Sequence, residues 1–512
     1  MENLLPFIIA IPLGAAFILP LLEKTSIGSQ LSRLIAVLVT VAILVLSYQG
    51  LMAYNADGEI RYWMGGWSDS SAALGISMVL DGMSSLMLLV VSIVAFAAIL
   101  FSLSYMKRYT AQPFYYCLFF LMLTGMLGVI LAGDIFNLYV FLEIAAISSY
   151  ALVAFGCEKE ELEAAFKYLV LGSVGSVFIL LGIAIVYNQT GHLNMARVHQ
   201  QLLTAGETSH ALLMAAAFFL MGFGLKAAMV PFHAWLPDAH PSAPAPISAM
   251  LSGVLIKALG VYALLRVFFN VLVMNIEFAY ILMTLGALSM VIGVFLAVGQ
   301  WDFKRLLAYH SVSQMGYVVL AVGVAGEMIL DGQNNIAAWA MLGGLFHLAN
   351  HATFKSLLFL CSGAAEYATG TRLLKKLGGL KHNMPITAGC LRIAALSISG
   401  VPPFNGFWSK LIIIIAVIMA GHYWLGAMTV LVSFMTLLSF IKVQRYILDG
   451  EPAPSVAHAT EVPWTMSLAM LLLAAICIGA GIFLGLYKDA VFDGASDVLL
   501  QNIGQLTLPA GG

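Results

Sequence analysis

Long apolar runs recur along almost the whole chain. A membrane-spanning helix needs roughly 20 apolar residues, and the pattern predicts about fourteen such spans. The polar segments between them are short, and the longest covers about 189–209, so no loop can hold a soluble catalytic domain. The predicted spans are 4–22, 34–54, 78–105, 114–132, 134–156, 164–188, 210–232, 245–270, 276–298, 303–326, 335–363, 384–420, 422–448 and 463–487.

Two of these spans are interrupted by proline. Pro231 follows Lys226 within an apolar run, and Pro402-Pro403 divides the overlong span 384–420. Proline removes a backbone donor and clashes with the preceding turn. The backbone groups that it frees in hydrocarbon need protein or water partners. Each interruption therefore predicts a broken helix that faces protein or a wet cavity.

The two breaks share a sequence pattern. MVPFHAWLP at 229–237 and GVPPFNGFWSK at 400–410 both place aromatic residues near proline and a lysine. Paired broken helices indicate inverted repeats with a site near the membrane midplane. Lys226 and Lys410 lie on opposite sides of their breaks, and a chance recurrence of proline beside aromatic residues is the alternative.

The composition agrees with a polytopic membrane protein and excludes several other classes. Residues are 61% hydrophobic and 9% charged, whereas a soluble protein is about 25% charged. The net charge of -2 and the lack of a basic patch give no reason to expect nucleic acid. The five cysteines have no CxxC spacing, so we expect no metal or cofactor site. The first residues lack the basic region of a cleaved signal, so the first helix is expected to stay.

Lysine and arginine gather on one set of loops. Cytoplasmic loops of membrane proteins carry an excess of these residues. We therefore expect the odd-numbered loops to be cytoplasmic and both termini to be on the other side. The odd-numbered loops and the end of span thirteen hold Lys24, Arg33, Lys107, Arg108, Lys159, Lys167, Lys304, Arg305, Arg372, Lys375, Lys376, Lys381, Lys442 and Arg445, and the even-numbered loops and their edges hold Arg61, Arg197 and Arg266.

Several ionisable residues interrupt otherwise apolar spans. Such residues usually face a bundle interior or a wet cavity and are functional by default. Three of them are spaced by four residues and so share one helix face. Asp81, Asp134 and Lys167 lie nearer span ends, where a cap or interfacial anchor is favoured. The candidate proton-pathway residues are Glu143, Lys226, Lys257, His347, His351, Lys355 and Lys410, with His233, His310 and Asp134 as accessory candidates.

These residue types suit a proton relay. Burial favours the neutral forms of lysine and glutamate, whereas a nearby opposite charge favours the charged forms. Histidine already exchanges protons near neutral pH. Structural explanations exist for single residues: Glu143 and Lys226 as a static ion pair, His347 as a satisfied core histidine, and Lys410 as a snorkelling side chain.

Several stretches resemble one family of membrane subunits. The family comprises antiporter-like subunits of respiratory complex I, Mrp-type multisubunit sodium/proton antiporters and membrane-bound hydrogenases. Within this family, the sequences AHPSAPAPISAMLSGV and PPFNGFWSK most resemble the D-type Mrp subunit and its hydrogenase-complex counterpart. The similar stretches, in order from residue 133 to 410, are GDIFNLYVFLEIAAISSYALVAFG, GLKAAMVPFHAWLPDAHPSAPAPISAML, FKRLLAYHSVSQMGY, HLANHATFKSLLFL and GVPPFNGFWSK.

The resemblance implies a fold and a role for each candidate. It implies an all-α protein of about fourteen transmembrane helices, with two inverted five-helix repeats and broken helices seven and twelve. The short tail after the last span leads us to expect no long lateral helix. The implied parts are an N-terminal three-helix segment at 1–110, repeats at 111–272 and 273–450, and a C-terminal helix and tail at 451–512. The implied roles are a fifth-helix glutamate for Glu143, its seventh-helix partner for Lys226, the central eighth-helix lysine for Lys257, the eleventh-helix relay for His347, His351 and Lys355, and the twelfth-helix lysine for Lys410.

We therefore expect a subunit that moves protons within a larger complex in the plasma membrane of a prokaryote. Its expected partners are other membrane subunits, protons and the lipid bilayer, with sodium left open and nucleic acid excluded. A redox activity would belong to the complex. One alternative is a stand-alone secondary transporter of a small solute, which would concentrate its polar groups in one place. The other is a structural subunit with static ion pairs.

Overall fold

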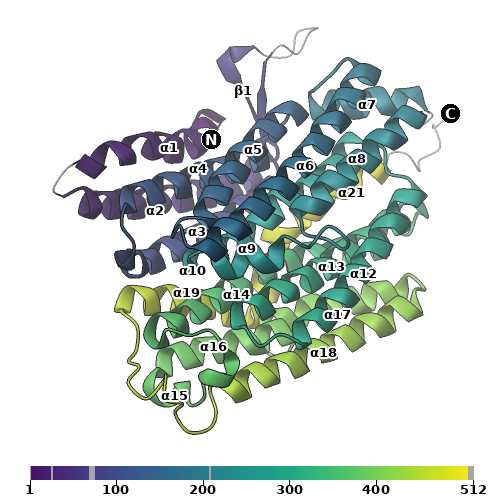
Figure 1. Cartoon of the computed structure of the whole chain (residues 1–512). Coiled ribbons are helices and arrows are strands. Elements are labelled where there is room, and N and C mark those ends of the chain that lie inside the picture. Colours follow the sequence, from purple (N-terminus) through teal and green to yellow (C-terminus); the bar gives the residue numbers. More distant parts are fainter. Residues whose placement is uncertain (1, 25–26, 68–74, 207–208, 505–512) are drawn as a thin grey trace.

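Helices pack side by side through nearly the whole chain (Figure 1). The computed structural model describes residues 2–24, 27–67, 75–206 and 209–504. Within these ranges, eleven helices are long and apolar enough to cross a membrane, and three shorter apolar helices accompany them. Each predicted span overlaps one of these helices, apart from 384–420, which holds two, and 335–363, which matches the long and more polar α14 (Asn334–Thr369). The predicted all-α polytopic fold is confirmed.

The helix bounds follow the apolar runs closely. The α-helices are α1 (Leu5–Ile18), α2 (Gly28–Asp57), α3 (Gly82–Tyr105), α4 (Gln112–Leu131), α5 (Ile135–Val153), α6 (Lys159–Thr190), α7 (Met195–Ala205), α8 (His210–Lys226), α9 (Leu236–Ser242), α10 (Ala245–Met250), α11 (Ala263–Arg266), α12 (Ile276–Val298), α13 (Phe303–Leu330), α14, α15 (Leu380–Asn383), α16 (Pro385–Ser399), α17 (Asn405–Met419), α18 (Tyr423–Ile447), α19 (Trp464–Ile482), α20 (Leu484–Lys488) and α21 (Gly494–Gly504). Short 3₁₀ helices cover Glu2–Leu4, Leu19–Lys24, Met64–Gly66, Met106–Arg108 and Leu374–Lys376, and π-helical turns cover η5 (Leu251–Tyr262), η6 (Val267–Val271) and η8 (Asp489–Asp493).

Both predicted breaks are present. The seventh span ends with α8 at Lys226, and the short helix α9 begins only at Leu236. The twelfth span is divided between α16, which ends at Ser399, and α17, which begins at Asn405. The eighth span continues from α10 to η6 and is π-helical over most of its length, a feature that apolar periodicity does not predict.

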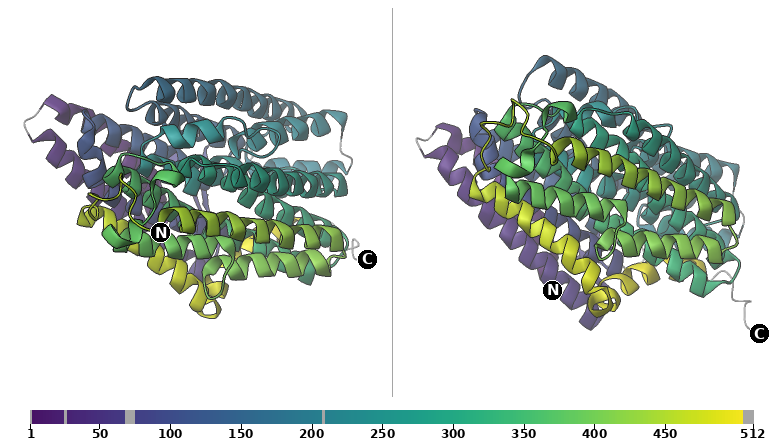
Figure 2. Two further views of the ribbon diagram at one scale, coloured as in Figure 1. Left: turned by 60° about the horizontal axis from the view of Figure 1, so that its bottom comes forward. Right: turned by 90° about the horizontal axis from the view of Figure 1, so that it is seen from below.

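Two strands and two helices were not predicted from the apolar pattern. Strands β1 (Ile60–Trp63) and β2 (Ser77–Leu80) form an antiparallel pair, so the predicted start of the third span at 78 is wrong. Its helix begins at Gly82 because Asp81 caps it. The segment predicted as a loop at 189–209 contains α7, and the predicted tail contains α21. Figure 2 shows the yellow C-terminal helices against the bundle, where α19 and α21 both contact α3.

Glycines bring α12 and α13 into close contact. A Cβ added at Gly316 would lie 2.5 Å from the carbonyl oxygen of Gly286, and a Cβ at Gly286 would lie 2.5 Å from the amide nitrogen of Leu320. Small residues allow membrane helices to approach backbone to backbone and to gain van der Waals contact. This contact belongs to the second half of the chain and supports the helix that carries Gln314 and His310.

We expect Gly316→Ala to lower the thermal stability of the purified assembly by roughly 1–3 kcal/mol, the usual effect of overpacking. The clash is with backbone atoms, which cannot turn aside. A thermal melt of the detergent-solubilised complex measures the effect. Gly389→Ala on α16 is the control, because a Cβ there has nothing within 4 Å. Equal melting temperatures for the two variants would contradict the close-packing interpretation.

Candidate functional site

The first ionisable pair joins α5 to the end of α8. Lys226 is buried, and its Nζ lies 3.7 Å from Glu143 Oε1. The same ammonium donates to the Tyr150 hydroxyl at 3.3 Å, and the Ser176 hydroxyl donates to Glu143. Lys226 is also the last residue of its helix, where the helix dipole favours a cation. The structure therefore brings these two sequence-predicted residues together.

Lys257 lies in the π-helical part of the eighth span and is fully buried. Its Nζ donates to the carbonyl oxygen of Ser252. The hydroxyl of Ser252 lies 2.7 Å from that of Ser311 on α13, which ties this turn to the second half of the chain. π-Turns within helices are frequent at functional sites. The lysine is thus held by a backbone carbonyl near the junction of the two halves.

Helix α14 carries three fully buried ionisable residues on one face, as the spacing predicts: His347, His351 and Lys355. His347 bridges two neighbouring helices. Its Nδ1 lies 2.9 Å from Ser409 Oγ on α17, and its Nε2 lies 3.2 Å from Gln314 Oε1 on α13. This histidine therefore has defined polar partners on both sides.

The other two groups on α14 are left without partners. In the described ranges, neither ring nitrogen of His351 nor Nζ of Lys355 has a hydrogen-bond partner. Their close neighbours include aromatic rings: the His351 ring lies 5.3 Å from that of Phe354, and Lys355 Nζ lies 5.8 Å from the Phe359 centroid. Buried polar groups without a protein partner are usually satisfied by internal water. This part of α14 has the chemistry that a hydrated relay requires.

Lys410 lies in the second turn of α17, next to the break. Its Nζ donates to the carbonyl oxygen of Ile398 at 2.8 Å and to Ser433 Oγ at 3.4 Å. It also lies over the Tyr317 ring, 5.3 Å from the centroid. The carbonyl belongs to the last turn of α16, so the ammonium caps one half of the broken helix from the other half. Lys410 is 2% exposed, which contradicts the snorkelling alternative.

The accessory candidates have separate surroundings. Asp134 caps α5 by accepting from the amides of Phe136 and Asn137 at 2.9 Å, so the cap favoured by its position is present. His310 is buried and its Nε2 lies 2.8 Å from Ser439 Oγ on α18. His233 is half-buried and lies within the first break, between α8 and α9.

His240 is a further candidate that the sequence analysis did not identify. It lies on α9 and is completely buried, and neither of its ring nitrogens has a hydrogen-bond partner among the described residues. Its ring lies 5.4 Å from the Phe359 ring of α14. The signal in the sequence was a histidine between two prolines, which reads as a turn rather than a buried site.

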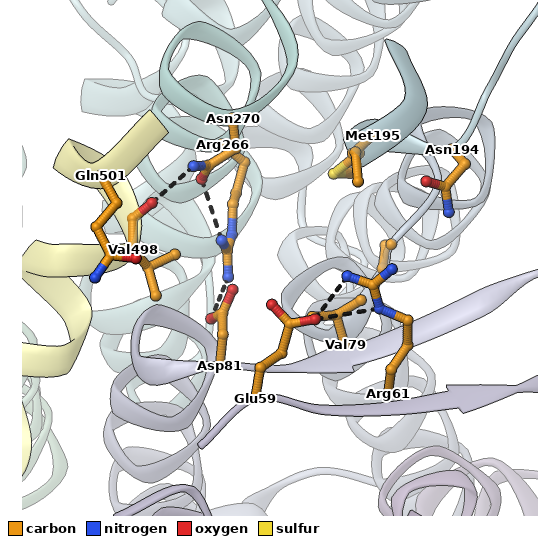
Figure 3. A pocket seen from close by; sticks show the side chains of 13 residues that line it. Glu59, Arg61, Val79, Asp81, Asn194, Met195, Arg266, Asn270, Val498 and Gln501 are labelled. Atoms are coloured by element: carbon orange, nitrogen blue, oxygen red, sulfur yellow. Dashed lines mark hydrogen bonds and ion pairs between the residues drawn. The ribbon is translucent and has the colours of Figure 1, made fainter. Parts of the chain in front are cut away.

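A second polar region lies at the end of the bundle that carries the strands (Figure 3). It is a cavity of about 160 Å³, lined among others by Asp81, Arg266 and Asn270. Arg266 Nη2 lies 2.5 Å from Asp81 Oδ1, and both side chains are buried. Arg266 lies five residues before the end of the eighth span, near the loop edge to which the sequence assigned it. Its charge is satisfied by Asp81, the residue that caps α3, so its side chain stays inside the bundle.

Two further charged groups were missed. Glu327 lies one residue beyond the predicted span 303–326, and its Oε2 is 2.5 Å from His422 Nε2. Arg392 lies within α16 with its side chain exposed on the outer surface. Neither group contacts the candidates above through a hydrogen bond or ion pair in the described part of the chain.

The matched family model gives the class of this protein. The model described as "NADH:quinone oxidoreductase/Mrp antiporter, TM" matches residues 132–436. A second model, for the N-terminus of complex I chain 5, matches residues 67–116. The first match covers more than half of the chain and includes every candidate proton-pathway residue. The chain belongs to this family.

Individual relatives come from more than one kind of complex. The chain is 32% identical to the D-type subunit of the Na(+)/H(+) antiporter of Alkalihalophilus pseudofirmus, over 96% of this chain and 95% of the relative. It is 33% identical to the N-type subunit of the NADH-quinone oxidoreductase of Desulforudis audaxviator, over 98% of each chain. A chain in the structure of the Mrp complex from Dietzia sp. superposes with a TM-score of 0.88 at 27% identity, over 98% of this chain and 99% of that chain.

These similarities identify an antiporter-like subunit of a multisubunit membrane complex. The family resemblance stated from the sequence is confirmed. The relatives that match almost the whole chain are named as subunits of complexes, so they do not support the alternative of a stand-alone transporter of a small solute.

Proposed function

We propose that this chain moves protons through the membrane along its buried ionisable side chains. The observation that carries the proposal is the partnerless pair on α14. His351 and Lys355 are fully buried without hydrogen-bond partners among the described residues, and His347, one turn before His351, contacts Ser409 on α17. Water that satisfies these groups would also connect them. The proposed pathway comprises Glu143, Lys226, Lys257, His347, His351, Lys355 and Lys410.

The Glu143–Lys226 contact is the control point in this proposal. At 3.7 Å the two charges attract each other without a short hydrogen bond between them. Tightening the contact holds the proton on Lys226, and loosening it favours release because the lysine is buried. His240 lies on the short helix after the break with its ring 5.4 Å from the Phe359 ring of α14, so it supplies a stepping group toward the second half.

A partner subunit would cover Glu143. Its side chain is 26% exposed, and it shares one outward face of α5 with Phe136, Val140 and Ile147, all of them exposed. A carboxylate facing lipid in the middle of a span is costly. A neighbouring membrane subunit on this face removes that cost and gives the partner direct influence on the first ion pair.

The proposal also includes the orientation of the chain in the membrane and two inverted repeats, at 111–272 and 273–450. With Arg266 buried against Asp81, the even-numbered loops retain only Arg61 and Arg197 of the three basic residues assigned to them. The lysine and arginine bias toward the odd-numbered loops supports a cytoplasmic location for those loops. Both termini would then lie on the non-cytoplasmic face of a prokaryotic plasma membrane.

The energy source follows from the complex rather than from this chain. One relative is named as part of a sodium/proton antiporter and another as part of an NADH-quinone oxidoreductase. We infer that the present subunit supplies the proton pathway in either setting. Proton movement driven by a sodium gradient without an electron donor would assign it to an antiporter complex, and a requirement for the donor would assign it to a redox complex.

Lys410→Ala tests the proposal. We expect proton transport by the reconstituted complex to fall by about a hundredfold or more, as when an acid–base group is removed. Proton uptake into proteoliposomes, read with a pH-sensitive dye, measures it. Subunit composition on a native gel verifies assembly. Wild-type transport by an assembled Lys410→Ala complex would rule out a pathway through α17.

A further inference from the structure

The start of α17 is fastened to α14 by reciprocal amide hydrogen bonds. Asn405 Nδ2 donates to Asn350 Oδ1 at 3.0 Å, and Asn350 Nδ2 donates to the backbone carbonyl of Asn405 at 3.1 Å. Thr353 Oγ1, one turn further along α14, accepts a second bond from Asn405 Nδ2 at 3.3 Å. All three side chains are buried, so these bonds do not compete with bulk water.

The same asparagine reaches back across the break. The Ser397 hydroxyl, near the end of α16, donates to Asn405 Oδ1. Gly406 lets the two halves approach, because a Cβ there would collide with the carbonyl of Ser397. Asn405 therefore joins the end of α16, the start of α17 and the middle of α14 through one side chain.

This junction lies beside the relay on both helices. Asn350 stands between His347 and His351 on α14, and Asn405 comes one turn before Ser409 and Lys410 on α17. The His347 Nδ1 to Ser409 Oγ contact is 2.9 Å. Hydrogen bonds are lost when the heavy atoms separate beyond about 3.5 Å. Lengthening that contact by about 0.6 Å is therefore enough to break it.

The first break is held in a different way. The Trp235 indole donates across it to the carbonyl of Leu225 at 2.9 Å. The same ring stacks on Tyr168 of α6 at 4.1 Å between centroids. These contacts tie the first break to α6, within the first half of the chain, whereas the second break is tied directly to the helix that carries the relay.

We propose that Asn350 and Asn405 are positioning residues that hold Ser409 and Lys410 in register with His347. The pair does not itself carry a proton. It keeps the last buried groups of the proposed pathway within contact distance at the point where the break at Pro402-Pro403 separates α17 from α16 along the chain. This inference rests on the proposed proton pathway, and it adds a reason why the second break coincides with the relay.

A double-mutant cycle tests the register role in the reconstituted complex. We expect Asn405→Ala and Ser409→Ala each to lower proton transport by roughly ten- to a hundredfold, the effect of misplacing a reacting group by about 1 Å. Because both changes remove the same contact, the double variant should be no slower than the slower single variant. Asn350→Ala should repeat the result for Asn405→Ala, which provides a second variant if one fails to assemble. Multiplicative losses, or wild-type transport by assembled Asn405→Ala and Asn350→Ala, would overturn the proposal.

The control is Ser104→Ala. The Ser104 hydroxyl lies 2.7 Å from that of Thr465 and joins α3 to α19 through another buried interhelical hydrogen bond. We expect this variant to transport at the wild-type rate when assembled. Lys410→Ala distinguishes failure of the proton pathway from failure of the positioning role. Normal transport by an assembled Lys410→Ala complex refutes the pathway. Loss of transport in Lys410→Ala together with normal transport in Asn405→Ala refutes only the positioning role.

Discussion

Proton transport by the assembled complex should be abolished by Glu143→Gln and by Lys226→Ala. The glutamine keeps the shape of Glu143 and its contact with Ser176 but removes the negative charge beside Lys226. The alanine removes the ammonium itself. We expect each change to lower the rate by at least about a hundredfold, measured as dye-reported proton uptake into proteoliposomes.

A lysine with similar charge pairing supplies the control for that experiment. Lys167 Nζ lies 2.8 Å from Glu163 and 3.1 Å from Asp238, but its side chain is exposed. Exposed ion pairs contribute little, so Lys167→Ala should transport at the wild-type rate. If the Glu143–Lys226 ion pair has only a structural role, the opposite result is expected for Glu143→Gln and Lys226→Ala. They would then assemble poorly, and whatever assembled would transport normally.

Lys355→Met should separate activity from stability. The methionine is of similar length and apolar, and it replaces an ammonium that is fully buried without a hydrogen-bond partner among the described residues. A lysine inside a membrane bundle is costly to bury even where internal water reaches it, and the methionine removes that cost. We therefore expect the melting temperature of the complex to hold or rise while proton transport falls by at least about a hundredfold.

Lys442→Met should lower the stability of the complex and leave proton transport unchanged. Lys442 Nζ donates to the carbonyls of Val298 and Gln300 at 2.7 and 2.8 Å, at the end of α12. Its loss leaves those carbonyls without the cation, so stability should fall while transport by the assembled complex persists. Identical behaviour of the two methionine variants would show that Lys355 serves packing rather than transport.

Features that depend on neighbouring residues in the sequence could be predicted. Spans follow from apolar runs, and the breaks follow from Pro231 and Pro402-Pro403, because proline acts on the turn that contains it. The stripe of His347, His351 and Lys355 follows from helix geometry, since residues four apart share a face. These local rules account for most of the helices and for the position of the candidate relay.

Features that depend on residues far apart could not be predicted. Arg266 is buried because it meets Asp81 from a distant span, and the sequence near Arg266 looks like the edge of a loop. His240 lies on a helix of only seven residues whose prolines indicate a turn. The asparagine junction has the same origin, because Asn350 becomes significant only when the fold places Asn405 against it.

The polarity of α14 has a consequence for how this protein is made. Among the described helices, α14 is the long one that does not qualify as apolar enough to cross a membrane by itself, because histidine, asparagine and lysine interrupt its apolar residues. The translocon partitions each segment according to its own hydrophobicity, and lysine is among the most unfavourable residues at the centre. We therefore expect the insertion of α14 to depend on neighbours such as α13 and α17, which contact it. The helix that carries the candidate proton-pathway residues would then enter the bilayer together with these neighbours, and its biogenesis would be coupled to the assembly of its surroundings.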